Sequence, residues 1–270
     1  MEQETLRLDV LISTYGADGI ERIASHRHPQ VAGVRYVVCW QRSGDAYVPE
    51  QLRTREDFDI FRYDDTGSAR NRNHTLERFE APIGMLSDDD IDYEAEELEN
   101  LIRCYDERPD ADMLFFKFHS ANYEKSYPDH EFDFRNAPRF YYYCNFEMSF
   151  RRRAVKDRVW FDERFGLNSP FLAGEEDMFV LRALKQGARI RFIPQYNSRH
   201  DGSTTSDREG ESEGMLLTRG AVISCFHPLS YPLRFVVHAL RRQNRSRGFL
   251  EFLKLLFKGA RQERSSRKSR

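Results

Sequence analysis

Short β-rich runs alternate with stretches long enough for helices over the first part of the chain, and this alternation constrains the fold more than any other feature. The runs that have the composition of strands are 8–13, 34–40, 58–63, 82–86 and 113–118, and a further strand-like run covers 145–150. Strands that alternate with helices pair in parallel through right-handed crossovers. The sequence therefore predicts an α/β protein with a parallel sheet and right-handed crossover helices over this part of the chain.

Three consecutive aspartates, Asp88, Asp89 and Asp90, follow the fourth predicted strand directly. Acidic residues before a helix are ordinary N-caps, but a cap needs only one of them, and three neighbouring carboxylates repel each other. A divalent cation removes that repulsion, and oxygen ligands favour Mg²⁺ or Mn²⁺ over zinc. Because ligands of open α/β sheets bind at the carboxyl ends of the strands, the cluster is a candidate metal site.

A second acidic run, Glu175, Glu176 and Asp177, opens a helix predicted over 175–186. Carboxylates in a first helical turn commonly complement the helix dipole. Three of them exceed what the dipole needs, so one carboxylate could instead act as a general base on a hydroxyl.

The block from Gly67 to Asn71 has the form of a phosphate-binding loop. A glycine turn leads into a helix, for which Ser68 is the expected N-cap, and Arg70 adds a bidentate donor. An exposed arginine on a surface helix is the simpler alternative. His200 follows the last predicted strand, 188–194, where it could contact a ligand or a phosphate.

In this order and spacing the blocks resemble family 2 glycosyltransferases of the GT-A fold, over about Leu8 to Thr205. The resemblance implies an α/β fold with a Rossmann-like mixed sheet flanked by helices. The likeness rests on Ser13-Thr14-Tyr15 after the first strand, on Gly67–Asn71, and on an Asp-x-Asp motif at Asp88–Asp90. It also rests on an acidic helix that ends in Lys185-Gln186-Gly187, and on His200 downstream.

The resemblance implies an inverting transferase that moves a sugar from a nucleotide-sugar to a hydroxyl of a glycan or lipid-linked acceptor, in surface polysaccharide synthesis. It implies Mn²⁺ or Mg²⁺ as cofactor, held by Asp90 together with Asp88 and His200. It places the general base at Glu176 or Asp177, and Asp177 is favoured because a plain Glu-Asp pair then fits the motif.

The same resemblance assigns a set of residues to the nucleotide-sugar. They are Thr14, Tyr15, Gly67, Arg70, Asn71, Asp88 and Asp89. A departure lies after the second strand, where many relatives carry an Asp-rich loop that reads the base and this chain has Trp40-Gln41-Arg42-Ser43-Gly44-Asp45. Asp45 is the candidate for that role, and a UDP-sugar is the favoured donor.

Two other functions compete with this one. A sugar-phosphate nucleotidyltransferase needs a glycine-rich loop with a basic residue after the first strand, and residues 15–19 hold glycines without Lys or Arg. A non-catalytic, transferase-like binding protein is the second alternative, and the intact acidic motifs count against it.

An aromatic stretch lies between residues 119 and 144. Its rings either stack on an acceptor sugar or pack as core. They are Tyr123, Tyr127, Phe132, Phe134, Phe140, Tyr141, Tyr142 and Tyr143.

The C-terminal segment differs in charge from the rest of the chain. Residues 231–270 contain 12 Lys or Arg and 2 Asp or Glu, a local balance of +10. We therefore predict a transferase domain over 1–228, with a nucleotide-sugar half at about 1–110 and an acceptor half at about 111–228, and a basic amphipathic helical tail over 229–270. The apolar stripe of the tail comprises Phe249, Phe252, Leu253, Leu256 and Phe257.

That stripe could lie on an anionic membrane or dock on the protein itself. No recognition motif supports a nucleic-acid partner. No apolar run is long enough to span a bilayer, the N-terminus lacks the pattern of a signal peptide, and the four cysteines show no zinc or disulfide spacing. We therefore expect a cytoplasmic protein, peripheral at the inner face of the cell membrane if the tail binds lipid.

Overall fold

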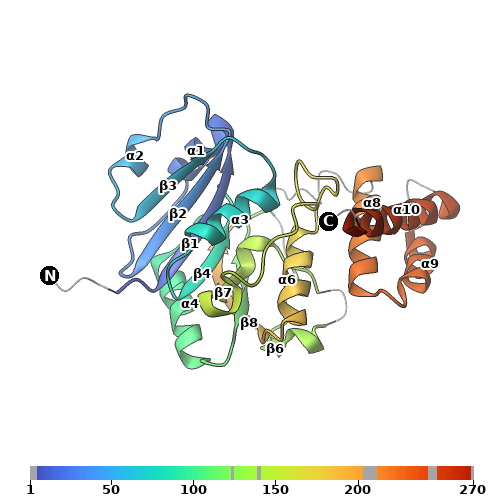
Figure 1. Cartoon of the computed structure of the whole chain (residues 1–270). Coiled ribbons are helices and arrows are strands. Elements are labelled where there is room, and N and C mark those ends of the chain that lie inside the picture. Colours follow the sequence, from blue (N-terminus) through green and yellow to red (C-terminus); the bar gives the residue numbers. More distant parts are fainter. Residues whose placement is uncertain (1–4, 123–124, 139–140, 203–211, 243–247, 269–270) are drawn as a thin grey trace. The chain divides into compact units, whose positions relative to one another are not determined.

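The computed structural model describes residues 5–122, 125–138, 141–202, 212–242 and 248–268. The chain divides into two compact units (Figure 1). Unit 1 comprises residues 1–66, 70–160 and 182–202, and unit 2 comprises 67–69, 161–181 and 203–270. The predicted domain boundary at residue 228 stays a prediction.

Unit 1 holds an eight-stranded sheet in the order β3-β2-β1-β4-β7-β5-β8-β6. The strands are β1 (Leu8–Tyr15), β2 (Val34–Gln41), β3 (Phe58–Tyr63), β4 (Ile83–Ser87), β5 (Met113–His119), β6 (Phe132–Asp133), β7 (Met148–Arg151) and β8 (Ile190–Arg199). Strands β3, β2, β1 and β4 pair in parallel, as do β5 and β8. β7 is antiparallel to β4 and to β5, so β5 and β8 run in the same direction as β1 to β4.

The α/β fold with a mixed sheet and flanking helices is therefore confirmed. The helices of unit 1 are α1 (Gly16–Ser25), α2 (Glu50–Arg53), α4 (Ala95–Glu107) and α5 (Arg152–Val155), and α3 (Ser68–Arg78) lies mostly within it. Of two short 3₁₀ turns, η1 (Phe134–Asn136) lies within the aromatic stretch and η2 (Asn145–Glu147) follows it.

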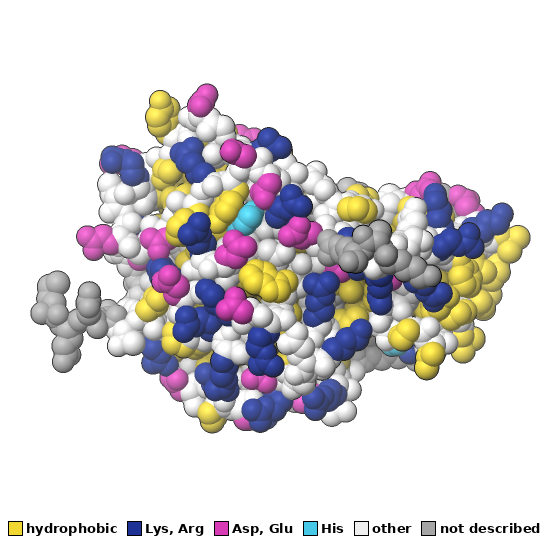
Figure 2. Space-filling model, viewed as in Figure 1, with side chains coloured by type: hydrophobic (Ala, Val, Ile, Leu, Met, Phe, Trp, Pro, Cys, Tyr) yellow, Lys and Arg dark blue, Asp and Glu magenta, His cyan; other side chains and the backbone are white. Residues whose placement is uncertain are grey.

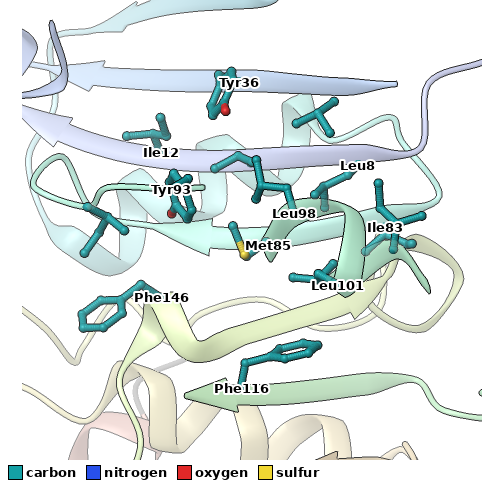
Figure 3. Packing of buried hydrophobic residues seen from close by; sticks show 14 of the residues in the cluster. Leu8, Ile12, Tyr36, Ile83, Met85, Tyr93, Leu98, Leu101, Phe116 and Phe146 are labelled. Carbon is teal, nitrogen blue, oxygen red and sulfur yellow. The ribbon is translucent and has the colours of Figure 1, made fainter. Parts of the chain in front are cut away.

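Alternating side chains of the strands form the core on one face of the sheet. Leu8 and Ile12 of β1 and Met85 of β4 pack with Leu98 and Leu101 of α4, as Figure 3 shows. Period-2 alternation sends the intervening residues to the opposite face. There α3 covers the sheet: the guanidinium of Arg78 lies 4.3 Å from the centre of the Phe61 ring, and His74 stacks on Tyr63 at 3.7 Å.

Among its described residues, unit 2 contains the helices α8 (Glu213–Phe226), α9 (Tyr231–Arg242) and α10 (Phe249–Lys268), together with the first part of α6 (Glu175–Lys185). Leu216, Phe235, Phe252 and Leu256 form the core between α8, α9 and α10. A second cluster joins Met178 and Leu181 of α6 to Ala221 and Cys225 of α8, with Phe165 and Phe171.

The structure bears on two expectations for the C-terminal half. Phe252 and Leu256 of the apolar stripe are fully buried against α8 and α9, which favours the second of its two alternatives, packing on the protein itself. The strand expected over 145–150 begins only at Met148, because residues 145–147 form η2.

Candidate active site

Parallel strands bring the predicted acidic cluster and its neighbours to one edge of the sheet. β1 ends at Tyr15, β4 ends at Ser87, and β8 ends at Arg199. Because these strands point the same way, the residues that follow each of them meet at the same edge. Backbone bonds between Asp92 and Arg199, at 3.0 and 2.9 Å, draw the end of β8 to the loop that follows β4.

Asp89 is held on both of its oxygens. The Thr14 hydroxyl donates to one oxygen at 2.6 Å, and Arg22 of α1 donates to both at 2.9 Å. Asn71, which is buried, donates its amide to the Thr14 carbonyl at 2.9 Å. These hydrogen bonds hold the loop after β4 against the end of β1. Asp89, Thr14 and Asn71 therefore have the contacts of positioning residues.

Asp88 faces a different set of donors. Asn145 of η2 donates its amide at 2.7 Å, and Arg72 of α3 donates at 3.3 Å. Burial raises the pKa of Asp88, and the repulsion of Asp90 and Asp89 adds to this, whereas Arg72 and Asn145 oppose it. A carboxylate in this setting is stabilised further by any added positive charge.

Asp90 and His200 form a pair. The Nε2 atom of His200 lies 3.3 Å from an Asp90 carboxylate oxygen. Burial alone would raise the pKa of Asp90, but the hydrogen bond and charge of His200 outweigh it and hold that pKa below its ordinary range. Burial likewise opposes the charge on His200, and Asp90 overcomes it and raises the pKa of the imidazole.

A metal ion would find two donors of suitable chemistry here. In the described residues no group of three or more His, Cys, Asp or Glu side chains is arranged to hold a metal. Mg²⁺ sites commonly use one or two carboxylates and complete their coordination with substrate phosphates and water. Asp90 supplies one such carboxylate, and His200 would add an imidazole nitrogen once it gives up the extra proton that Asp90 favours.

The carboxyl ends of β2 and β3 carry a polar group that sequence reasoning missed. Asp65 accepts from Gln41 Nε2 at 2.7 Å and lies 2.8 Å from His74 Nε2. Burial would raise the pKa of Asp65, but these two hydrogen bonds lower it overall. Arg70, half exposed, lies 4.0 Å from the same carboxylate. The sequence did contain a signal for this group, because the polar residues Gln41 and Asp65 stand at the end of β2 and just after β3.

Asp45, the expected reader of the base, is exposed in the loop after β2. Arg62 pins this loop by donating to the Ala46 carbonyl at 2.8 Å and by lying 4.4 Å from the Trp40 ring centre. Tyr15, also predicted to border the nucleoside, is half exposed at the end of β1.

The second acidic run opens α6 in unit 2, as predicted. Glu175 is buried and accepts from the Ser68 hydroxyl at 2.8 Å. Ser68 is the first residue of α3 and follows Gly67, whose φ is +120°, so Ser68 does not precede the helix as an N-cap would. Glu176 and Asp177 are half-buried. Glu175 therefore has a structural role as the buried acceptor of the Ser68 hydroxyl.

Where it is described, the aromatic stretch packs against the core: Phe132 is buried, whereas Tyr142 is half exposed. Phe132 stacks on Phe192 at 5.0 Å, and Tyr141 meets Phe192 edge-on at 5.5 Å. Tyr127 donates to Glu147, which forms a buried ion pair with Lys125 at 2.6 and 2.7 Å. Tyr123 and Phe140 lie outside the described residues.

Comparisons with known proteins bear on the fold. No protein-family model and no curated protein matches the chain. Among solved structures it resembles S. aureus TarS 1-349, with a TM-score of 0.64, 15% identity, and coverage of 98% of this chain and 92% of that one. A crystal structure of the same protein in complex with UDP gives a TM-score of 0.63 at 16% identity, and the match covers 98% of this chain and 92% of that one. The complex with UDP-GlcNAc gives a TM-score of 0.60 at 17% identity, and the match covers 88% of this chain and 72% of that one. At these identities the likeness shows the fold, and it confirms the predicted GT-A, Rossmann-like architecture.

Proposed function

We propose that the protein is a glycosyltransferase that moves a sugar from a nucleotide-sugar, with UDP as the favoured nucleotide, to a hydroxyl of a glycan or lipid-linked acceptor. The observation that carries the proposal is the meeting of Thr14, Asp88, Asp90 and His200 at one carboxyl edge of a GT-A sheet. TarS, which shares this fold, has been crystallised with UDP-GlcNAc and with UDP, and this supports the choice of donor.

In the proposed mechanism, a carboxylate removes the proton from the acceptor hydroxyl as its oxygen attacks the anomeric carbon. The bond from that carbon to the diphosphate breaks, and the electron pair leaves with the nucleotide. A single displacement of this kind inverts the anomeric configuration. Arg70 would donate to the leaving diphosphate.

Asp90 and His200 would hold Mn²⁺ or Mg²⁺ with Asp88 close by, and a bound cation would offset the charge of the departing diphosphate. Asp88 contributes a second carboxylate, kept in place by Asn145 and Arg72. Thr14 and Asp89 would hold the loop after β4 at the distance from β1 that the donor needs.

The general base is proposed to be Asp177, with Glu176 as the alternative. Glu175 is excluded from this choice because its carboxylate is buried and bonded to Ser68. Neutralising a general base at constant shape lowers kcat by roughly 10²–10⁴-fold. We therefore expect that loss for Asp177→Asn and a smaller one for Glu176→Gln, with little change in donor KM.

The test is nucleotide release from a panel of nucleotide-sugars with Mn²⁺ or Mg²⁺, run with and without acceptor glycans. Asp90→Ala and treatment with EDTA should each abolish release, while Glu99→Ala, an exposed carboxylate on α4, serves as the matched control. Activity that survives both treatments would remove the metal assignment. Absence of turnover with every donor would favour a non-catalytic, transferase-like binding protein.

A further inference from the structure

Helix α9 and the turn before it expose an apolar stripe that no described element covers. Leu229, Leu233, Val237 and Leu240 are 97%, 69%, 38% and 54% exposed. The spacing of four and three residues places Leu233, Val237 and Leu240 on one side of the helix, and Leu229 lies in the turn that precedes α9. The other side of α9 buries Phe235 and Ala239 between α8 and α10. The stripe is therefore additional to the core, and the core does not account for it.

The start of α10 also exposes an apolar side chain. Leu250, the second residue of α10, is 68% exposed. Figure 2 shows hydrophobic side chains gathered over α9 and α10, with Lys and Arg side chains beside them. We call Leu229, Leu233, Val237, Leu240 and Leu250 the α9 face.

Exposed cations flank the α9 face. Arg234 follows Leu233 on α9, and Lys254 and Arg261 are exposed on α10 at helical spacing from Leu250. Over residues 231–270 the sequence holds 12 basic and 2 acidic side chains. This region of unit 2 therefore combines large aliphatic side chains with a strong positive charge.

The chemistry of the α9 face selects its partner. A second copy of the same face would bring arginines and lysines together without counter-charges. A nucleic acid would match the charge but leave the leucines in water, since stacking on bases requires aromatic or guanidinium planes. An anionic bilayer accepts both, because leucines enter the acyl boundary while Arg and Lys reach the headgroups.

We propose that the α9 face docks on the surface of an anionic membrane, with α9 and the start of α10 lying in the interface. The buried stripe of α10 takes no part, because it holds the three helices together. In the described residues no helix is both long and apolar enough to cross a bilayer, so the proposed contact is with one surface.

The experiment is flotation of the full chain with vesicles of phosphatidylcholine alone or mixed in equal parts with phosphatidylglycerol. The protein should float with the mixed vesicles and stay at the bottom with the neutral ones. Leu233→Ser/Leu240→Ser should weaken binding about tenfold or more, because two aliphatic side chains no longer enter the bilayer. Arg234→Gln/Lys254→Gln should weaken it to a similar degree and reduce its dependence on salt.

Tyr47→Ser, which removes an equally exposed apolar side chain from unit 1, is the matched control and should float like the wild type. Because all of these residues are exposed, each variant should keep its unfolding midpoint. Failure of the wild type to float with mixed vesicles would overturn the proposal, as would undiminished flotation of the leucine variant. A wild-type dimer that the leucine substitutions convert to a monomer, without vesicle binding, would assign the face to a second copy. Duplex DNA binding that those substitutions leave unchanged, without flotation, would assign the charge to nucleic acid.

Discussion

Replacement of Gly259 by alanine would put a methyl group where α10 crosses α8. A Cβ at residue 259 would lie 1.9 Å from the carbonyl oxygen of Leu217 and 2.9 Å from its Cα. The crossing is reciprocal, because a Cβ at Gly220 would lie 2.1 Å from the carbonyl oxygen of Leu256. These neighbours are backbone atoms, so no side chain can rotate away and the helices themselves must separate.

The size of the effect follows from these distances. An ordinary carbon–oxygen contact is about 3.3 Å, so α10 would have to retreat by more than ~1 Å. A gap of that size removes about half of the dispersion attraction between Leu216, Phe252 and the other side chains that face each other across the crossing. Overpacking costs about 1–3 kcal/mol, and a clash with backbone belongs at the upper end. The better helix propensity of alanine returns about 1 kcal/mol. We expect a net loss of about 2 kcal/mol.

Urea unfolding followed by far-UV circular dichroism and by tryptophan fluorescence is the assay. The chain has two tryptophans, Trp40 and Trp160, and both lie in unit 1. A transition that circular dichroism detects and fluorescence does not therefore belongs to unit 2, where Gly259→Ala should act. Ser265→Ala, exposed on the same helix, is the matched control and should change the midpoint only slightly.

The double variant Gly220→Ala/Gly259→Ala separates this reasoning from a general loss of stability. Once one methyl has pushed the helices apart, the second finds room, so the double variant should cost little more than the worse single one. Costs that simply add, or a Gly259→Ala protein as stable as the Ser265→Ala control, would show that the helices do not cross as closely as described.

Three other outcomes follow from contacts in unit 1. Thr14→Val removes a 2.6 Å hydrogen bond to Asp89, and hydrogen bonds to charged groups contribute about 1.5–3 kcal/mol. The donor KM should therefore rise about tenfold or more in the nucleotide-release assay. An unchanged KM would refute the positioning role. Glu147→Ala leaves the buried ammonium of Lys125 without its partner and should cost about 3–5 kcal/mol in urea unfolding, whereas a loss under ~1 kcal/mol would mean that water reaches the site. Burial lowers the pKa of His28 from 6.5 to about 4, so the folded protein keeps this imidazole neutral where the unfolded chain protonates it. Stability should fall as the pH drops from 6.5 toward 4, by about 2 kcal/mol near pH ~5, and His28→Leu should flatten that slope in thermal unfolding.

Periodicity predicted the elements of the fold because they are local. The five strands expected between residues 8 and 118 match β1 to β5 within two residues at each end, since each is a run of β-formers bounded by turn residues. β8 extends beyond its predicted end at Pro194, because pairing with β5 carries it on to Arg199. The strand predicted over 145–150 is wrong for residues 145–147, and the reason is a tertiary contact. Glu147 accepts hydrogen bonds from Lys125 and from the Cys144 amide, and these hold residues 145–147 in a 3₁₀ turn.

The candidate site was predicted in part for the same reason. Asp88, Asp90 and His200 could be placed at strand ends from the sequence, because a parallel sheet gathers its strand ends on one edge. The residues that hold the cluster could not, since Arg22 and Asn145 come from 67 and 57 residues away along the chain. Only the position of β7 beside β4 brings Asn145 to Asp88.

The insertion of β7 between β4 and β5 has a consequence for biosynthesis. β1 to β4 are neighbours in the chain and in the sheet, so residues 8–87 can assemble early as the chain is made. The outer edge of β4 then has no partner strand until residues 148–151 are available, and all five β4 residues are buried in the complete fold. An unpaired hydrophobic edge is a site of aggregation. Nascent or truncated chains that end before β7 should therefore depend on chaperones in a way that the completed chain does not.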